Sequence, residues 1–239
     1  MIIKSISNPS RRIRVNQAAE SLFSQSPFLK VIAGIENFDA ENIREVASAA
    51  DGLVAAIDLS TDEASVRWVK SQTGLQVFVS SLDPKALIQS LDWGTDWVEL
   101  GNFQPIYDRG ALINPDMVMD WTRELVAGVA GRAGICITVP GILSLEQQIA
   151  LAQDIQAAGA DLIQIENLSG DLSHVQPIAA AVSIPVMVAG HLNAGNLSQA
   201  QSTGADGYGI GSAIRKAGDK AAMRELIAQL AQQLSPVSV

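Results

Sequence analysis

The sequence predicts a single α/β domain, a (β/α)8 barrel of the TIM type, on three observations. The chain has 239 residues, a length that suits one undivided barrel over residues 1–239. Hydrophobic residues make up 48% and aromatic residues 5%, which is typical of aliphatic strands buried on both faces of a parallel sheet. Short β-branched runs also alternate with helical patterns eight times, and such repeated units imply parallel strands joined by right-handed crossovers.

The eight units follow one another with short connections and no linker. We expect strands over residues 30–35, 53–59, 76–81, 97–103, 135–139, 162–167, 186–191 and 207–211. Helical patterns follow them over residues 41–50, 63–73, 84–93, 115–129, 145–158, 175–182, 197–202 and 219–234. The barrel proper therefore spans about residues 29–235.

Residues 1–25, ahead of the first strand, carry four basic side chains and no acidic one before Glu20. This bias resembles a transit peptide. Asn8-Pro9 is instead a helix start signal, because Pro is tolerated at the first helical position. We favour an extra N-terminal helix.

Composition excludes several classes of protein. The formal net charge is −9, without the clustered basic residues that nucleic-acid binding needs, so we expect no nucleic-acid partner. No apolar run approaches the roughly 18 residues that span a bilayer, so we expect no membrane partner. Cys136 is the one cysteine, which excludes an internal disulfide and suits a reducing compartment. Trp93 and Trp97 indicate either a contact surface in a homo-oligomer or core.

A Gly-x-Asp pattern stands three times between a helix and the next strand. It occurs at residues 94–96, 159–161 and 204–206, with 50–52 as a variant. Gly there caps the preceding helix in a left-handed conformation, and Asp lies just before the strand. Barrel chemistry belongs to the other ends of the strands, so we interpret these aspartates as structural.

The last two strands predict a phosphate site. The eighth ends in Gly211-Ser212 and opens into a helical turn, which leaves backbone N–H groups and a helix dipole directed at one spot. The seventh ends in Gly190-His191. Loops after strands seven and eight commonly hold phosphate in this fold. Many phosphate barrels have Gly-Gly where this chain has Gly190-His191, so His191 either contacts phosphate itself or narrows the site.

Polar residues at the carboxyl ends of the other strands form a second group of candidates. Asp58, Glu99 and Glu166 are carboxylates among β-branched residues, where they either line the barrel mouth or meet a structural partner. Lys30 begins the first strand. If it points inward, it meets Glu99 or Asp58, and burial depresses its pKa and suits it to proton transfer or imine chemistry. Otherwise it lies at the bottom rim.

We take Lys30, Asp58, Glu99 and Glu166 as the catalytic candidates. Further residues in or beside the same segments are expected to line the site: Asn37, Ser80, Asn102, Tyr107 and Thr138. The histidines, cysteine and carboxylates show no zinc-type spacing, so no metal site is predicted.

Four blocks of the sequence together resemble one known family. They are residues 29–38, 79–86, 98–103 and 209–214. Their combination is similar to the hypothetical chloroplast open reading frame 23 family of cyanobacteria and plastids, over about residue 29 to the end. The resemblance implies an α/β barrel in the cytoplasm of a cyanobacterium or the plastid stroma. It implies no particular reaction and no catalytic role for any residue.

Three functions fit these residues. The leading hypothesis is an enzyme, an isomerase or a lyase, that acts on a small phosphorylated molecule, because such reactions need a base near a carbon acid. A barrel that binds FMN through its phosphate is the second, since the same cradle suits that cofactor. The third is a barrel that binds a phosphometabolite in a regulatory role without turnover. The fold hosts all three.

Overall fold

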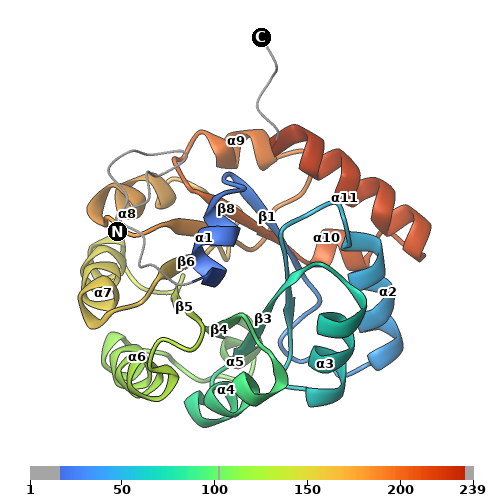
Figure 1. The fold of residues 1–239 in the computed structure, drawn as a ribbon. Coiled ribbons are helices and arrows are strands. Elements are labelled where there is room, and N and C mark those ends of the chain that lie inside the picture. The colour runs from blue at the N-terminus through green and yellow to red at the C-terminus, as the bar shows by residue number, and fades with distance from the viewer. Residues whose placement is uncertain (1–16, 102, 235–239) are drawn as a thin grey trace.

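A computed structural model describes residues 17–101 and 103–234 of the chain, where eight parallel strands close into one barrel. The strands are hydrogen-bonded in sequence order, and β8 pairs back to β1. Helices form a ring outside them (Figure 1). The predicted fold class is thus confirmed. The expected helix start at Asn8-Pro9 lies outside the described residues.

The elements lie within a few residues of their expected bounds. The strands are β1 (Phe28–Ile32), β2 (Ala56–Leu59), β3 (Gln76–Ser81), β4 (Trp97–Leu100), β5 (Gly134–Val139), β6 (Leu162–Glu166), β7 (Val186–Ala189) and β8 (Gly207–Ile210). The helices of the ring are α2 (Ala40–Ala50), α3 (Glu63–Gln72), α4 (Pro84–Ser90), α6 (Pro115–Val129), α7 (Leu145–Ala158), α8 (Val175–Ala181), α9 (Leu197–Gln201) and α11 (Lys220–Leu234). A 3-10 turn, η1 (Leu91–Trp93), follows α4.

Three short helices lie outside the ring pattern. α1 (Gln17–Phe23) precedes the barrel, and in Figure 1 it lies across the inner ring of strands. α10 (Ser212–Arg215) is the helical turn expected after β8. α5 (Gln104–Tyr107) was not expected, because four residues are too few to show helical periodicity.

Side-chain capping explains where several helices of the ring begin. Asp39, Asp62, Asp83 and Asn114 each accept hydrogen bonds from backbone N–H groups in the first turn of the helix that follows. Ser144 forms a capping box with Gln147 at the start of α7. These caps satisfy N–H groups that have no partner inside the helix.

The lower half of the barrel interior is a separate apolar cluster. Phe28, Phe78 and Trp97 fill it, and the rings of Phe78 and Trp97 stack with centroids 5.0 Å apart. Leu22 and Phe23 of α1 belong to the same cluster, so this helix closes the bottom of the barrel. Trp97 is completely buried there, so of the two alternatives for this residue, contact surface or core, the second is confirmed.

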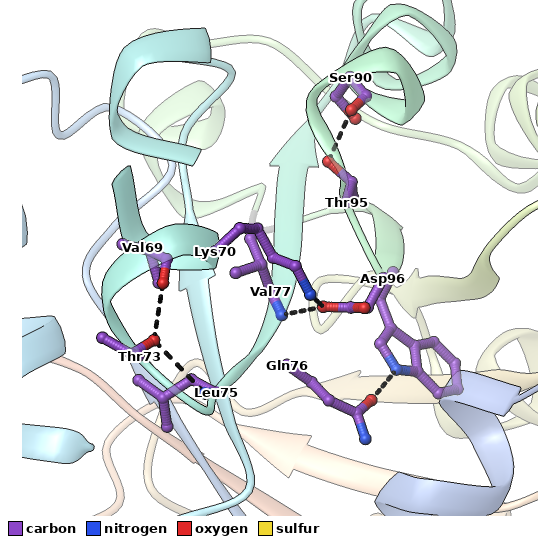
Figure 2. A network of polar contacts seen from close by, with 10 residues as sticks. Val69, Lys70, Thr73, Leu75, Gln76, Val77, Ser90, Thr95 and Asp96 are labelled. Atoms are coloured by element: carbon purple, nitrogen blue, oxygen red, sulfur yellow. Dashed lines mark hydrogen bonds and ion pairs between the residues drawn. The ribbon is translucent and has the colours of Figure 1, made fainter. Parts of the chain in front are cut away.

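The aspartates before the strands have the structural role expected of them. Asp96 accepts a hydrogen bond from the backbone N–H of Val77, the second residue of β3, at 2.8 Å (Figure 2). Asp161 and Asp206 do the same for β5 and β7. Each carboxylate thus satisfies an N–H at the start of a neighbouring strand, on the face of the barrel away from the strand carboxyl ends.

Candidate functional site

A cavity of about 230 Å³ opens at the carboxyl ends of the strands. Its walls carry three groups of polar or glycine residues that matter for chemistry, together with a few apolar ones. These groups are the carboxylates Asp58, Glu99 and Glu166, the amides Gln104, Gln164 and Asn167, and the β7 and β8 turn residues Gly190, His191, Gly211, Ser212 and Arg215.

A polar network crosses the middle of the barrel beneath this cavity. Lys30 forms an ion pair with Glu99, and its Nζ also donates to Oε1 of Gln164 at 3.1 Å. The Gln164 Nε2 donates to Glu99 at 3.0 Å and to the Thr138 hydroxyl at 3.1 Å. All four side chains are buried. Each charge in the network has a partner, because a buried charge without one is energetically costly.

Lys30 therefore points inward, and the alternative position at the bottom rim is wrong. Its side chain is 0% exposed and its Nζ lies 4.7 Å from the centre of the Phe78 ring. Burial lowers the pKa of Lys30, but the carboxylates of Glu99 and Asp58 raise it by more, so that the net shift is upward. The depressed pKa expected from burial is not found, and the cationic amine is absent from the cavity wall.

Asp58 is the carboxylate with an uncommitted oxygen. It is 1% exposed and accepts a hydrogen bond from the Ser80 hydroxyl through Oδ1, while Oδ2 has no hydrogen-bond partner. Burial raises the pKa of Asp58 to about 7, although the charge of Lys30 lowers it. A buried carboxyl group that titrates near neutrality, at a cavity wall, is suited to proton transfer.

The turns after β7 and β8 approach the cavity from its other side. Gly190 has φ 107° and lies so close to β6 that a Cβ atom would come within 2.1 Å of the Asn167 carbonyl oxygen. His191 follows with φ 55°, a left-handed conformation that few non-glycine residues adopt. The two residues form a tight turn at the cavity edge, which only glycine fits at position 190.

Arg215 places a positive charge beside the Gly211-Ser212 turn. It ends α10, and its Nη1 donates to the Ile32 carbonyl oxygen at 2.6 Å. A Cβ atom on Gly211 would lie 2.8 Å from this nitrogen. The guanidinium group is therefore folded back over Gly211, at the wall of the cavity, where an anion would meet it together with the first turn of α10.

Glu166 lies at the cavity wall, but both of its oxygens are occupied. Oε1 accepts from the backbone N–H of Phe103, and Oε2 accepts from the Tyr107 hydroxyl and the Gly141 N–H, at 2.9 to 3.0 Å. Burial raises the pKa of Glu166, and these donors lower it by less. The contacts connect the loops after β4 and β5, so their geometry favours a structural role for Glu166 over the expected catalytic one.

Four further expected residues, Asn37, Ser80, Tyr107 and Thr138, are not part of the described cavity wall. Ser80 donates a hydrogen bond to Asp58, Thr138 accepts one from Gln164, and Tyr107 donates one to Glu166. Asn37 forms hydrogen bonds with Ala33 and Asp39 in its own loop and with Asn42 in α2. Asn102 lies outside the described residues.

Sequence reasoning did not select four wall residues: Gln104, Gln164, Asn167 and Arg215. Arg215 had a usable signal, since it stands three residues after Ser212 in a helical turn next to an expected anion site. Gln164 and Asn167 stand among the polar residues that end the sixth expected strand, but uncharged polar residues are common there, and Gln104 follows no strand end directly.

The described segments contain neither a candidate metal cluster nor a helix that could span a membrane. Between residues 17 and 234, leaving out residue 102, no cluster of three metal-ligating side chains was found. Within the same part of the chain, no helix combines the length and apolarity required to cross a lipid bilayer.

A family model described as "Protein of unknown function (DUF561)" matches residues 15–239. The chain belongs to this family. DUF561 relatives carry the name ycf23, which confirms the resemblance found in the sequence. "Uncharacterized protein ycf23" from Antithamnion sp. is 33% identical over 231 residues, covering 85% of this chain and 83% of the relative. Its counterpart from Porphyra purpurea is 27% identical over 227 residues, covering 87% and 85%.

Solved structures similar to this DUF561 chain share its fold. A 3-hexulose-6-phosphate synthase is 20% identical with a TM-score of 0.66, over 85% of this chain and 99% of that one. Thiamine phosphate pyrophosphorylase from Pyrococcus furiosus is 19% identical with a TM-score of 0.62, over 88% and 98%. Orotidine 5'-phosphate decarboxylase from Pyrococcus horikoshii is 16% identical with a TM-score of 0.62, over 85% and 99%.

Proposed function

We propose that the protein is an enzyme that acts on a small phosphorylated metabolite, by isomerase or lyase chemistry. One observation carries this proposal. The unpartnered Oδ2 of Asp58 is buried in the same cavity wall as the guanidinium group of Arg215. The cavity thus combines a proton-transferring group with an anion-binding one. The structural neighbours named above support the ligand class, since each name includes a phosphate compound.

The phosphate in this proposal is bound on the side of β7 and β8. The turn at Gly190-His191 and the Gly211-Ser212 turn supply backbone donors, and Arg215 supplies the charge. In this proposal Arg215 supplies the anion contact that a second glycine at position 191 provides in other barrels. The site can therefore bind phosphate with His191 in that position. Neutralisation by a guanidinium group is a stronger contribution than one extra backbone N–H.

Asp58 is the proposed general base and acid. The Ser80 hydroxyl holds Oδ1 of its carboxyl group through a hydrogen bond, and Oδ2 is left without a hydrogen-bond partner. In this scheme Asp58 takes a proton from a carbon or hydroxyl group next to a carbonyl and returns it to the product. Lys30 and Glu99 are positioning residues that act through their charges on Asp58. Imine chemistry is not part of the proposal, because Lys30 is buried in its ion pair.

The test is a thermal-shift screen of phosphorylated sugars, followed by hydrogen-deuterium exchange at carbon in the ligands that bind. We expect stabilisation that is lost in Gly211→Asp, because the new carboxylate lies next to the Arg215 guanidinium, neutralises it and repels a phosphate. We expect carbon exchange that falls by a factor of about 10² or more in Asp58→Asn. Exchange equal to that of the unaltered protein would refute the assignment of Asp58.

The two other hypotheses make different predictions in the same screen. FMN is not favoured, since drug-sized ligands occupy pockets of roughly 300–1,000 Å³ and this cavity has about 230 Å³. Uptake of yellow flavin by the purified protein would restore it. A regulatory barrel would be stabilised by a ligand without exchange or product on long incubation.

From the family resemblance we also propose a location in the cyanobacterial cytoplasm or the plastid stroma.

A further inference from the structure

The cavity wall carries more acidic than basic side chains, and this imbalance limits which groups the ligand can carry besides its phosphate. Three carboxylates reach the described part of the wall, at Asp58, Glu99 and Glu166. Arg215 is the one Lys or Arg side chain among the described wall residues. A ligand with two anionic groups could therefore pair only one of them with a permanent positive charge of the described wall.

The carboxylates differ in how far they are compensated. Glu99 is paired with Lys30, and Glu166 is surrounded by hydrogen-bond donors from two loops. Asp58 receives one donor, the Ser80 hydroxyl, and its second oxygen has no hydrogen-bond partner. The floor of the cavity thus presents an acceptor, or an ionised carboxylate, to the end of the ligand that lies there.

Lys30 cannot compensate the negative charge of Asp58 when an anionic group of a ligand binds beside it. Its Nζ is committed to Glu99 and Gln164, and its side chain is 0% exposed. Recruiting it would leave Glu99 buried without a counter-charge, which is strongly unfavourable. A carboxylate on the ligand would then face Asp58 at short range with no cation available.

We propose that the substrate is a phosphate monoester whose reacting end is an uncharged hydroxy-carbonyl group, and that the Asp58 floor rejects phosphorylated carboxylic acids. This inference rests on the proposed function, because it assumes that phosphate binds beside Arg215. Such specificity comes as much from repulsion of the wrong ligand, here by Asp58, as from attraction of the right one, here by Arg215. Hydroxyl groups of the substrate satisfy the open oxygen of Asp58, whereas a carboxylate has no hydrogen to donate.

The rejection is expected to strengthen with pH. The charged and titratable groups that act on Asp58 are Lys30, Glu99 and Arg215, with the Ser80 hydroxyl as its donor. Because the pKa of Asp58 is raised to about 7, the group changes from a neutral donor to a repelling anion as the pH rises through that range. Below it, a protonated Asp58 tolerates a carboxylate.

The test uses two three-carbon probes that differ at one end, glycerol 3-phosphate and 3-phosphoglycerate, with inorganic phosphate as a third. Dissociation constants are measured by calorimetry about one unit above and one unit below the pKa of Asp58. At the higher pH we expect glycerol 3-phosphate to bind at least about tenfold more tightly than 3-phosphoglycerate. In Asp58→Asn we expect the two affinities to become equal within about threefold, as at the lower pH.

Variants at arginine separate this inference from the proposed function. Arg215→Leu should weaken all three probes by about tenfold or more, whereas Arg123→Leu, on an exposed side chain of α6, should change none. If no probe binds, or binding ignores Arg215, the phosphate site itself is refuted. If the probes bind through Arg215 but 3-phosphoglycerate equals glycerol 3-phosphate in the unaltered protein, the uncharged reacting end is refuted and the phosphate site stands.

Discussion

Single residues in the barrel interior carry charges that most proteins keep in water. Lys30 and Glu99 are 0% and 1% exposed, and each is the main counter-charge of the other. A buried pair of this kind contributes little net stability, but losing one partner is costly because the other charge remains. The pair therefore governs both folding and the electrostatic potential at Asp58.

A double-mutant cycle tests this coupling. Lys30→Met is expected to lower the free energy of unfolding by about 3–5 kcal/mol, because Glu99 is left buried and unpaired. Lys30→Met combined with Glu99→Gln should recover at least half of that loss, since no charge remains. Urea unfolding gives both values. Equal stability of the single variant and the unaltered protein would show that the pair is not a buried ion pair in solution.

Asp58 makes a prediction about stability as a function of pH. Its pKa in the folded protein is raised to about 7 from an ordinary value of 3.8. Between these values the folded state binds more protons at this group than the unfolded state, so its contribution to stability falls as the pH rises. Asp58→Asn keeps an acceptor for Ser80 and does not titrate.

The midpoint of thermal unfolding of Asp58→Asn, relative to the unaltered protein, should therefore rise between about pH 4 and pH 7 and level off above. Scanning calorimetry over this range measures it. Asp108→Asn, at an exposed site in the loop after β4, serves as the matched control for the removal of one carboxylate. A flat difference for Asp58→Asn would mean that the pKa of Asp58 is not raised.

At the scale of elements, the loops after β4 and β5 are joined to β6 by one side chain. Glu166 accepts the backbone N–H groups of Phe103 and Gly141 and the hydroxyl of Tyr107. This arrangement holds α5 at the rim of the cavity, where Gln104 contributes to the wall. A four-residue helix has little stability of its own, so tertiary contacts decide where it lies.

Glu166→Gln replaces one acceptor oxygen with an NH2 group that faces hydrogen-bond donors. We expect at least one of the amides of Phe103 and Gly141 to exchange with solvent about tenfold faster or more, because they bond to different oxygens and a lost bond of this kind costs about 1–3 kcal/mol. Hydrogen exchange followed by NMR resolves these amides. Amides in β2 provide the internal reference, and unchanged exchange at both loop positions would contradict the role of Glu166.

The aspartates at the bottom face make a second prediction at this scale. Asp96 accepts from the Val77 N–H at 2.8 Å and pairs with Lys70 at 2.6 Å. Asp96→Ala should cost about 1–3 kcal/mol by leaving the strand N–H unsatisfied. Lys70→Met removes only a partly exposed ion pair and should cost less than about 1 kcal/mol. Equal losses in chemical denaturation would show that the ion pair, and not the strand contact, is the stabilising interaction.

The whole molecule is arranged along the barrel axis in three levels. α1 and an aromatic cluster close the bottom, the Lys30 network lies in the middle, and the cavity opens at the top. Glycines at the lower level make room for the rings, since a Cβ atom on Gly134 would lie 2.4 Å from the Trp97 ring. The apolar packing inside the barrel thus lies at the end away from the site, where conservation in this fold is associated with stability.

Removing the closure at the bottom should affect stability and not binding. Phe23→Ala is expected to cost about 3–5 kcal/mol, because its ring packs edge-on against Phe28 and Trp97. Ser21→Ala, on the exposed side of α1, should stay within about 0.5 kcal/mol. Affinity for inorganic phosphate should be the same in both variants. A cost below about 1 kcal/mol for Phe23→Ala would mean that α1 does not close the barrel in solution.

Much of the fold could be predicted because the repeat is local in sequence. Alternation of β-branched runs and amphipathic helices predicted the strands from Phe28 to Ile210, and the Gly-x-Asp pattern predicted the bottom face. Parts of the candidate site were predictable too, since Asp58, Glu99 and Gly211 stand at strand ends. The direction of Lys30 and the burial of Trp97 were left open between two alternatives, because alternation along a strand does not say which set of side chains faces the barrel interior.

The sequence by itself determined the eight-fold alternation, the polarity of each strand end and the position of the glycine turns, because these follow from local spacing and propensity. Tertiary structure alone decided which charges meet. Lys30 and Glu99 are 69 residues apart, and Asp58 and Arg215 come from opposite ends of the chain. Only closure of the barrel brings them within electrostatic range, and only that closure leaves one oxygen of Asp58 open while Glu99 and Glu166 are satisfied.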